Sequence, residues 1–333
     1  MEDERISLAH GNGGRFMREL IEEVFARNLV HSDLDVHADA VPISMNGGEV
    51  MITTDGFTVQ PLEFPGGDIG SLAVHGTVND LAVAGARPLY LTLNAFIEEG
   101  LEIAILDRIV ARLAKAAEDV GVKVSAGDTK VLRRGEGGGL YLATTGVGVR
   151  LAGVRPSLGL IESGDVIMIN GPVGDHGTAV MLAREEFGLR GELKSDAASV
   201  CEFTEALMDF DGLRFMRDPT RGGIASVAHE VVRATGFGVR FDAAIPVRDQ
   251  VQSVCDMLGY DPYYLACEGR VMAVIAEHQA EAALAAWRAI PSGADAARIG
   301  RIVDGDARVI LETSLGGERF LEELEDDPLP RIC

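Results

Sequence analysis

Four aspartates stand among glycines and apolar residues, which is an unusual setting for a charged side chain. They are Asp55 in TTDGF, Asp80 in VNDLA, Asp128 in AGDTK and Asp218 in RDPTRGG. Mg²⁺ prefers hard oxygen ligands, and a site with two or three ions needs several carboxylates. Asp55 and Asp128 each follow a predicted strand, where α/β folds usually place ligand groups. The pattern predicts that the four aspartates bind magnesium, although Asp-Gly is also a common turn signal.

The segment HGTVNDLAVAGARP, residues 75–88, places polar residues on an otherwise apolar predicted helix. His75 and Asn79 are four residues apart and share one face of that helix, as do Gly76 and Asp80. The glycine would let a ligand or another backbone approach closely. These residues indicate a binding site, and the structural alternative is a core histidine with an asparagine partner.

Three glycine-rich segments precede predicted helices, whose first N–H groups favour phosphate. They are the loop of Gly11, Asn12, Gly13 and Gly14, the segment 171–177 (GPVGDHG) and the segment 220–223 (TRGG). We interpret the first as a flexible lid or a phosphate loop. Glycine-rich loops are common, so each one alone is weak support for a site.

Two charged residues stand in apolar surroundings. Lys130 follows AGDT, and Glu268 lies in LACEGRVMAVIA, just before a strongly apolar predicted strand. A partly buried glutamate has a raised pKa and can act as a base or an acid. The alternative for Glu268 is a strand-edge carboxylate that faces water.

Cys333 ends the sequence in PRIC, after an acidic run and two prolines that favour an extended backbone. From Glu322 such an arm would reach about 40 Å, at ~3.3 Å per residue. We interpret Cys333 as a thiol that visits more than one active site; an accidental terminal cysteine is the alternative. A prenylation box is excluded, because it needs its cysteine fourth from the end. The cysteines that we expect to be buried are Cys201, Cys255 and Cys267.

The bulk composition limits the class of protein. The formal net charge of −22 argues against binding to nucleic acid or to anionic membranes. No apolar run reaches the ~20 residues that span a bilayer, and no apolar segment follows the N-terminal MEDERIS, so we expect a cytoplasmic protein. The chain has no GxxxxGK[ST] loop. A nucleotide would therefore be bound through metal ions and aspartates.

Strands and helices alternate in both halves of the chain, which predicts two α/β or α+β domains. We place them at residues 1–153 and 154–320, with residues 321–333 as a flexible tail. The predicted strands are 49–54, 89–97, 122–126, 140–149, 165–170, 238–241, 270–275, 298–303 and 307–311. The predicted helices are 68–84, 102–120, one from about residue 178, 196–210, 223–235, 248–258 and 277–289.

These segments together resemble the HypE carbamoyl dehydratases, a family of hydrogenase maturation proteins, over essentially the whole chain. The matching segments are HGNGG, TTDGFTVQP, GDIGSLAVHGTVNDLAVAGARP, AGDTKV, GPVGDHG, RDPTRGG, LACEGR and PRIC. The family belongs to the ATP-binding superfamily of aminoimidazole ribonucleotide synthetase. The resemblance implies the two-domain fold of that superfamily, with N-terminal domains paired in a homodimer and with ATP and Mg²⁺ as cofactors.

The resemblance also implies roles for single residues. The metal ligands would be Asp55, Asp80, Asp128 and Asp218; the nucleotide contacts would be Gly11, Asn12, Gly13, Gly14, Asn79, Thr129 and His176; the catalytic residues would be Cys333, Glu268, Lys130 and His75. The implied reaction is ATP-dependent dehydration of an S-carbamoyl group on Cys333 to a thiocyanate. The carbamoyl group would come from the carbamoyltransferase HypF, and the cyanide would pass through the HypC–HypD complex to the iron of [NiFe] hydrogenase.

Two other interpretations stay open. Selenide water dikinase and thiamine-monophosphate kinase share the superfamily, but the former usually carries a reactive cysteine or selenocysteine near its N-terminal glycine-rich loop. Here the first cysteine is Cys201, and the kinase has no use for a PRIC end. A non-catalytic scaffold that binds nucleotide and presents its tail is the third interpretation. Formation of ADP would distinguish an enzyme from a scaffold.

Overall fold

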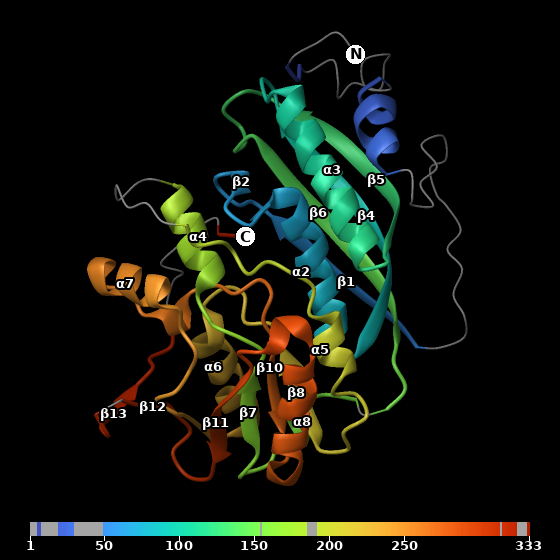
Figure 1. The fold of residues 1–333 in the computed structure, drawn as a ribbon. Coiled ribbons are helices and arrows are strands. Elements are labelled where there is room, and N and C mark those ends of the chain that lie inside the picture. The colour runs from blue at the N-terminus through green and yellow to red at the C-terminus, as the bar shows by residue number, and fades with distance from the viewer. Residues whose placement is uncertain are drawn as a thin grey trace. The chain divides into compact units, whose positions relative to one another are not determined.

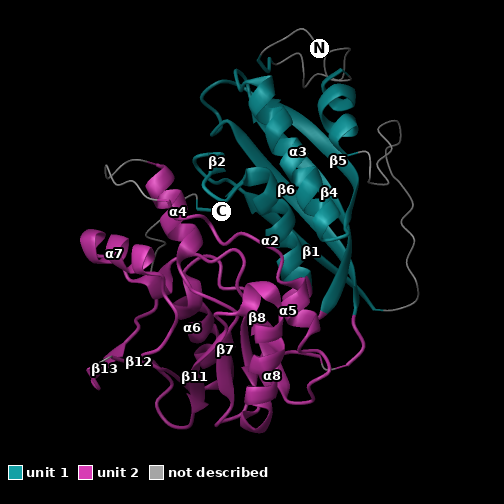
Figure 2. Cartoon of the chain, in the orientation of Figure 1, with its two compact units in different colours: residues 1–81, 86–150, 331–333 teal, residues 82–85, 151–330 magenta. Residues whose placement is uncertain are grey.

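The computed structural model describes residues 5–7, 19–29, 49–153, 155–184, 192–313, 315–324 and 332–333. The chain divides into two compact units, shown in different colours in Figure 2. Unit 1 comprises residues 1–81, 86–150 and 331–333, and unit 2 comprises residues 82–85 and 151–330. The end of the sequence therefore belongs to unit 1, although it follows unit 2 along the chain. Among the described residues, no helix has the length and apolar character needed to cross a membrane.

Unit 1 is built on a four-stranded sheet with the order β1-β6-β4-β5 (Figure 1). Its strands are β1 (Val50–Phe57), β4 (Ala86–Glu98), β5 (Lys123–Leu132) and β6 (Leu140–Arg150). β4 and β5 are parallel, and the other neighbouring strands are antiparallel. A separate small ladder joins β2 (Glu63–Phe64) and β3 (Gly67–Asp68).

Two helices, α2 (Ile69–Val83) and α3 (Ile103–Asp119), lie along one face of this sheet (Figure 1). The apolar residues of α3 recur every three or four positions and are buried, which confirms the predicted helix 102–120. Asp68 caps α2, because its Oδ1 accepts a 2.8 Å hydrogen bond from the N–H of Ser71. The predicted start of that helix is thus confirmed. A short π-helix, η2 (Ile21–Ala26), contacts α3.

The other face of the sheet carries exposed apolar side chains. Ile52 is 70% exposed and Val50 is 54% exposed on β1, and Phe96 of β4 is also exposed. Within the described part of the chain, no helix covers this face. We call it the open face of unit 1.

Two aspartates lie inside strands rather than after them, so that part of the sequence prediction was wrong. β1 continues through Asp55 and Gly56, and β5 continues through Asp128 to Leu132. Gly127, which lies just beyond the predicted strand 122–126, instead occupies a tight position in the sheet. A side-chain carbon there would lie 2.5 Å from the carbonyl oxygen of Leu93.

Unit 2 contains a seven-stranded sheet with the order β13-β12-β9-β11-β7-β10-β8. In chain order the strands are β7 (Val166–Ile169), β8 (Leu213–Arg217), β9 (Gly238–Phe241), β10 (Met272–Ile275), β11 (Ala297–Val303), β12 (Val309–Glu312) and β13 (Glu318–Phe320). All residues of β7 are buried, because apolar clusters cover both of its faces. One cluster includes α6 (Gly223–Thr235) and the other includes α8 (Glu277–Ala289).

Helices α6 and α8 and strand β9 have the bounds that the sequence predicted. Two further helices, α4 (Asp175–Ala183) and α7 (Asp249–Leu258), begin within a few residues of their predicted starts. The predicted helix 196–210 is wrong in extent, because only α5 (Cys201–Glu205) forms there. Before it, the hydroxyls of Ser195 and Ser199 accept hydrogen bonds from the nearby N–H groups of Ala197 and Cys201, and this competes with helix.

Candidate functional site

The contact between β1 and α2 brings two predicted metal ligands onto one seam. Gly76 of α2 lies against β1, since a side-chain carbon there would be 2.8 Å from the ring of Phe57 and 3.9 Å from Oδ2 of Asp55. One helical turn further on, Oδ2 of Asp80 accepts a 2.9 Å hydrogen bond from the hydroxyl of Thr53. Thr53 and Asp55 are two residues apart and share one face of the strand. We call this contact the β1–α2 seam.

The last residue of the sequence, Cys333, contacts the residue that follows β1, the strand that carries Asp55. A main-chain carboxylate oxygen of Cys333 accepts hydrogen bonds from the backbone N–H of Thr58 at 3.0 Å and from its hydroxyl at 3.2 Å. Thr58 directly follows β1, three residues after Asp55. Ile332 is only 2% exposed, and Cys333 is half-buried. The predicted catalytic cysteine is thus placed next to the strand that carries Asp55.

Asp128 and Lys130 lie on the open face, away from the seam. Cross-strand pairing through β4 and β6 links Asp128 to Gly56, the neighbour of Asp55. Successive residues of a strand point to opposite faces, so Asp55 and Asp128 point to opposite sides of the sheet. Nζ of Lys130 lies 2.9 Å from Oδ2 of Asp128, and this hydrogen bond lowers the pKa of Asp128. Thr129, between them, is buried.

His75 and Asn79 lie on α2, and Asn79 is buried there at 1% exposure. Burial lowers the pKa of His75 to about 4, although the nearby charge of Asp119 acts in the other direction. Nδ1 of His75 has no hydrogen-bond partner among the described residues. The imidazole is therefore neutral at pH 7, which suits a hydrogen-bonding role better than that of a general acid.

The lowered pKa of His75 predicts a pH-dependent stability. Below pH 6.5 the unfolded chain takes up a proton at this residue, whereas the folded chain does so only near pH 4. The free energy of unfolding should therefore fall as the pH falls through this window, by about 3 kcal/mol for this group. Urea unfolding between pH 7 and pH 4 measures it.

The variant His75→Gln removes the titrating group and should lose this part of the pH dependence. His278→Gln is the control, because His278 is exposed on α8; it should follow the wild-type curve. A His75→Gln protein with the wild-type pH profile would contradict the assignment.

In unit 2, Asp218 and Glu268 lie in neighbouring segments. The N–H of Cys267 donates a 3.0 Å hydrogen bond to the carbonyl oxygen of Pro219, which joins the RDPT and CEG segments. Glu268 is 2% exposed and Asp218 is 7% exposed. The structure therefore brings these two predicted site residues together as buried carboxyl groups on adjacent loops.

A mostly buried arginine, Arg270, contacts the Glu268 segment and two other loops. Oδ1 of Asp196 accepts a 3.2 Å hydrogen bond from the backbone N–H of Glu268, and its Oδ2 lies 3.2 Å from Nε of Arg270. Arg270 also lies 3.5 Å from Oδ2 of Asp175, and its Nε donates to the carbonyl oxygen of Pro172 at 2.7 Å. Arg270 thus holds the backbone that carries Glu268 against the GPVGDHG loop.

The GPVGDHG loop itself is buried where it enters α4. His176 is fully buried, and its Nδ1 lies 2.8 Å from the hydroxyl of Ser195. Burial raises the pKa of Asp175, and the opposing influence is Arg248, whose Nε donates to it at 2.8 Å. His176, a predicted nucleotide contact, is therefore buried within unit 2, where its imidazole is hydrogen-bonded to Ser195.

Within the part of the chain that the structure describes, no three His, Cys, Asp or Glu side chains are grouped so as to hold a metal ion. Asp55 and Asp80 share the β1–α2 seam of unit 1, and Asp218 belongs to unit 2. The predicted loop of Gly11 to Gly14 lies outside the described residues.

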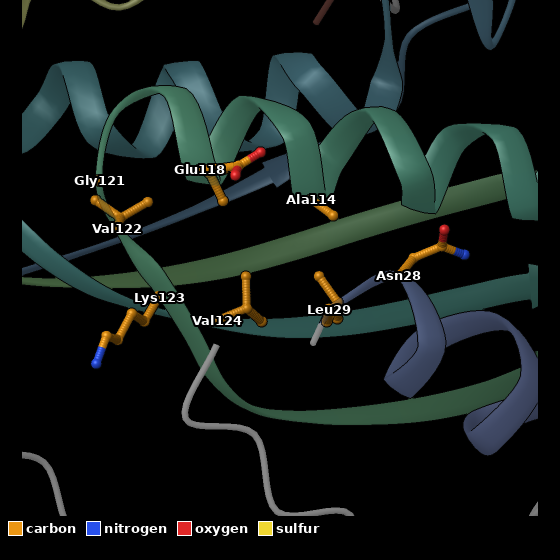
Figure 3. Close-up of a pocket in the computed structure, with 9 residues that line it drawn as sticks. Asn28, Leu29, Ala114, Glu118, Gly121, Val122, Lys123 and Val124 are labelled. Atoms are coloured by element: carbon orange, nitrogen blue, oxygen red, sulfur yellow. The ribbon is translucent and has the colours of Figure 1, made fainter. Parts of the chain in front are cut away.

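A cavity of about 210 Å³ lies between the end of the η2 region, α3 and the start of β5 (Figure 3). Its lining includes Leu29, Ala117 and Val124, with Lys123 also contributing. None of the predicted site residues lines it. It is a mainly apolar cavity without a carboxylate pair or a nucleophile.

Sequence reasoning did not identify Thr53, Thr58, Asp196 or Arg270. Thr53 and Thr58 stand within three residues of Asp55 in ITTDGFT, so proximity to a proposed ligand was a usable signal for both. Asp196 is 72 residues from Glu268. No local pattern links positions so far apart in the chain.

This chain is similar to proteins of one family over its whole length. The N-terminal domain of AIR synthase related proteins matches residues 37–150, and the C-terminal domain of the same proteins matches residues 162–312. Carbamoyl dehydratase HypE of Rhodobacter capsulatus is 44% identical over 338 residues, covering 100% of this chain and 99% of that protein. The HypE of Escherichia coli K12 is 38% identical over 334 residues, covering 98% and 99%.

Solved structures give the same result. Hydrogenase maturation protein HypE in complex with ATP has a TM-score of 0.92 and 42% identity, covering 98% of this chain and 99% of that one. A HypE–HypF complex gives a TM-score of 0.80 and 38% identity, covering 93% and 100%. Thiamine-monophosphate kinase of Stenotrophomonas maltophilia K279a, at 19% identity and a TM-score of 0.65, shares the fold alone. The predicted resemblance and the two-domain α/β fold class are confirmed, and the chain belongs to the HypE family of carbamoyl dehydratases, with two AIR synthase related domains.

Proposed function

We propose that this protein uses ATP to dehydrate an S-carbamoyl group on Cys333 to a thiocyanate. The observation that carries the proposal is the docking of Cys333 on Thr58, next to the strand of Asp55. The relatives named carbamoyl dehydratase and the similar structure with ATP support the reaction class. The tail, residues 321–333, is proposed to deliver the cysteine.

The chemistry requires activation of a carbonyl oxygen. A thiocarbamate, Cys–S–C(=O)–NH₂, loses water poorly because hydroxide is a poor leaving group. Transfer of the γ-phosphoryl group of ATP to that oxygen forms an O–P bond and releases ADP. The C–O bond then breaks, phosphate leaves with the oxygen, and the nitrogen gives up its two protons. The products are Cys–S–C≡N, ADP and phosphate, so the elements of water leave within phosphate and as protons.

We assign the proton removal to Glu268, a carboxyl group on a buried and firmly held segment of unit 2. Lys130 would polarise the phosphate or carbamoyl oxygen, and the neutral His75 would act by hydrogen bonding. The nucleotide contacts are proposed to be Gly11, Asn12, Gly13, Gly14, Asn79, Thr129 and His176.

The β1–α2 seam fits a magnesium ion by its donor chemistry. Asp55 and Asp80 supply hard carboxylate oxygens on the same seam, since Asp80 accepts a hydrogen bond from Thr53, which shares a strand face with Asp55. We propose Asp55 and Asp80 as Mg²⁺ ligands in unit 1, and Asp218 as a Mg²⁺ ligand contributed by unit 2. When bound, the ion would neutralise charge on the phosphate oxygens during transfer.

Asp128 is proposed to act at a different nucleotide from Asp55 and Asp80. It is paired with Lys130 and points from the open face, so within one chain it does not face the same ion as Asp55. We propose that two copies pair through their open faces, because exposed Ile52 and Val50 form an apolar surface there. Asp128 and Lys130 would then act at a nucleotide near the partner copy.

The variant Asp80→Asn tests the metal assignment. It keeps an oxygen for Thr53 but removes the charge, so the Kd for Mg²⁺–ATP should rise about 10- to 100-fold, the worth of one charged contact. Isothermal titration with and without Mg²⁺ measures this change. The matched control is Asp304→Asn, at an exposed site in unit 2, which should bind like wild type. Equal affinity in the two variants would remove Asp80 from the ligand set.

The proposed dehydration reaction is tested directly on Cys333. Protein carbamoylated at Cys333 is incubated with Mg²⁺ and ATP, and the terminal peptide is analysed by mass spectrometry. We expect the loss of one water from that peptide, with one ADP per conversion. ADP formation without this mass change would contradict the proposal. The proposed carbamoyl donor is HypF, the proposed cyanide acceptor is HypC–HypD, and the proposed location is the cytoplasm.

A further inference from the structure

Thr58 donates two hydrogen bonds to a single oxygen of Cys333. Its backbone N–H lies 3.0 Å and its hydroxyl 3.2 Å from this main-chain carboxylate oxygen, although the two residues are 275 positions apart. Two donors from one residue fix the direction of approach as well as the distance, because both must point at the same acceptor. The contact is therefore a tertiary one and does not belong to any helix, strand or turn.

Thr58 lies between two buried residues at the end of a paired strand. Its neighbours Phe57 and Val59 are 2% and 0% exposed, and Phe57 pairs with Leu142 in the sheet. The ring of Phe57 also packs against Gly76 of α2. The two donors of Thr58 are therefore held in place before the cysteine arrives, so that docking orders only the arriving segment.

Ile332 gives the arriving segment an apolar anchor. It is 2% exposed and directly precedes Cys333, so one buried side chain and one bonded main-chain oxygen fix two consecutive residues. We propose that Thr58 is a positioning residue for Cys333, a latch that binds the cysteine backbone while Ile332 is buried. This inference rests on the proposed function of Cys333 and identifies what places its sulfur.

The latch binds the backbone oxygen and not the sulfur. Once that oxygen is held, the side chain of Cys333 is limited to the few staggered rotamers about its first torsion. The same two hydrogen bonds can form whether the sulfur is a thiol, carries a carbamoyl group or carries a cyano group. Thr58 would therefore position the substrate and the product alike, and release would depend on the opening of the Ile332 anchor.

Alkylation of the unmodified protein tests the latch. Iodoacetamide is applied without ATP or carbamoyl donor, and protease Glu-C then cleaves after Glu325, so that mass spectrometry reports the reaction of Cys333 alone. The variant Thr58→Val keeps the size and the backbone donor but lacks the hydroxyl. Its alkylation rate should be about 10-fold above wild type, the worth of one hydrogen bond to a charged carboxylate in a docking equilibrium.

Thr58→Ser is the matched control, because it restores the hydroxyl; it should react at the wild-type rate. Ile332→Ala supplies an independent variant on the other side of the contact and should also react faster. If Thr58→Val and Ile332→Ala both react at the wild-type rate, the latch is wrong.

The reaction of carbamoylated protein gives the second measurement. Thr58→Val should form thiocyanate more slowly at saturating ATP, because a smaller fraction of the protein is docked, with the KM for ATP unchanged and with recovery in Thr58→Ser. Wild-type protein that forms thiocyanate while Thr58→Val shows neither change would overturn the latch alone. Faster alkylation of Thr58→Val in a protein that never forms thiocyanate would uphold the docking contact and overturn the proposed function.

Discussion

The variant Cys333→Ala should bind Mg²⁺–ATP within twofold of wild type and form no thiocyanate. The substitution removes the sulfur that we propose carries the carbamoyl group, while the main-chain oxygen that Thr58 binds remains in place. Because the sulfur is the substrate-bearing atom, its loss should lower ADP formation coupled to dehydration by more than about 10³-fold, as for a covalent nucleophile. ADP release and mass analysis of the terminal peptide measure the two effects.

Cys201→Ala is the matched control for this experiment. Cys201 is also a half-buried thiol, and burial raises its pKa, so it is a weaker nucleophile than an ordinary cysteine. Its variant should keep wild-type turnover. If carbamoyl-dependent ADP formation survives in Cys333→Ala, or is lost in Cys201→Ala, the wrong cysteine has been assigned.

The variant Arg270→Ala should be less stable than wild type by about 3–5 kcal/mol, the cost of leaving buried charges without their partner. This guanidinium is the ion-pair partner of Asp196, whose side chain is 1% exposed, and it is a second partner of Asp175, which also accepts a hydrogen bond from Arg248. The side chain of Arg270 is itself only 12% exposed, so water screens the group poorly. Urea unfolding followed by circular dichroism measures the free energy of unfolding.

Arg298→Ala provides the comparison on the surface of the same unit. Arg298 pairs with Glu277 at 3.0 Å, but the glutamate is 61% exposed, so the loss should be below about 1 kcal/mol. Arg270→Lys should be intermediate, since lysine keeps the charge but cannot reach both aspartates with a planar fork. Equal stability of Arg270→Ala and Arg298→Ala would contradict the importance of the buried network.

The sequence predicted well those features that depend on local patterns. The predicted helices 68–84 and 102–120 agree with α2 and α3 to within one residue at each end. The strands β7 and β10 of unit 2 were predicted at 165–170 and 270–275, but β8 was not predicted. The predicted helix 196–210 failed because serine side chains compete for its backbone groups, a contact that hydropathy does not report.

The candidate site was predictable in its residue types and not in its geometry. The sequence treated Asp55 and Asp128 as equivalent, yet the strand register places them on opposite faces of one sheet. Register depends on pairing between distant strands, so no local spacing could reveal it. The same holds for Arg270, whose partners come from separate loops, and for Thr58, whose partner is 275 residues away.

The return of residues 332 and 333 to unit 1 has a consequence for biosynthesis. Translation delivers the strands and helices of unit 1 first and unit 2 next, and domains generally fold as they emerge. Ile332 and Cys333 leave the ribosome only afterwards. Their attachment to Thr58 can therefore form only after the residues of unit 2 have been synthesised, and it returns the chain to the unit that folds first.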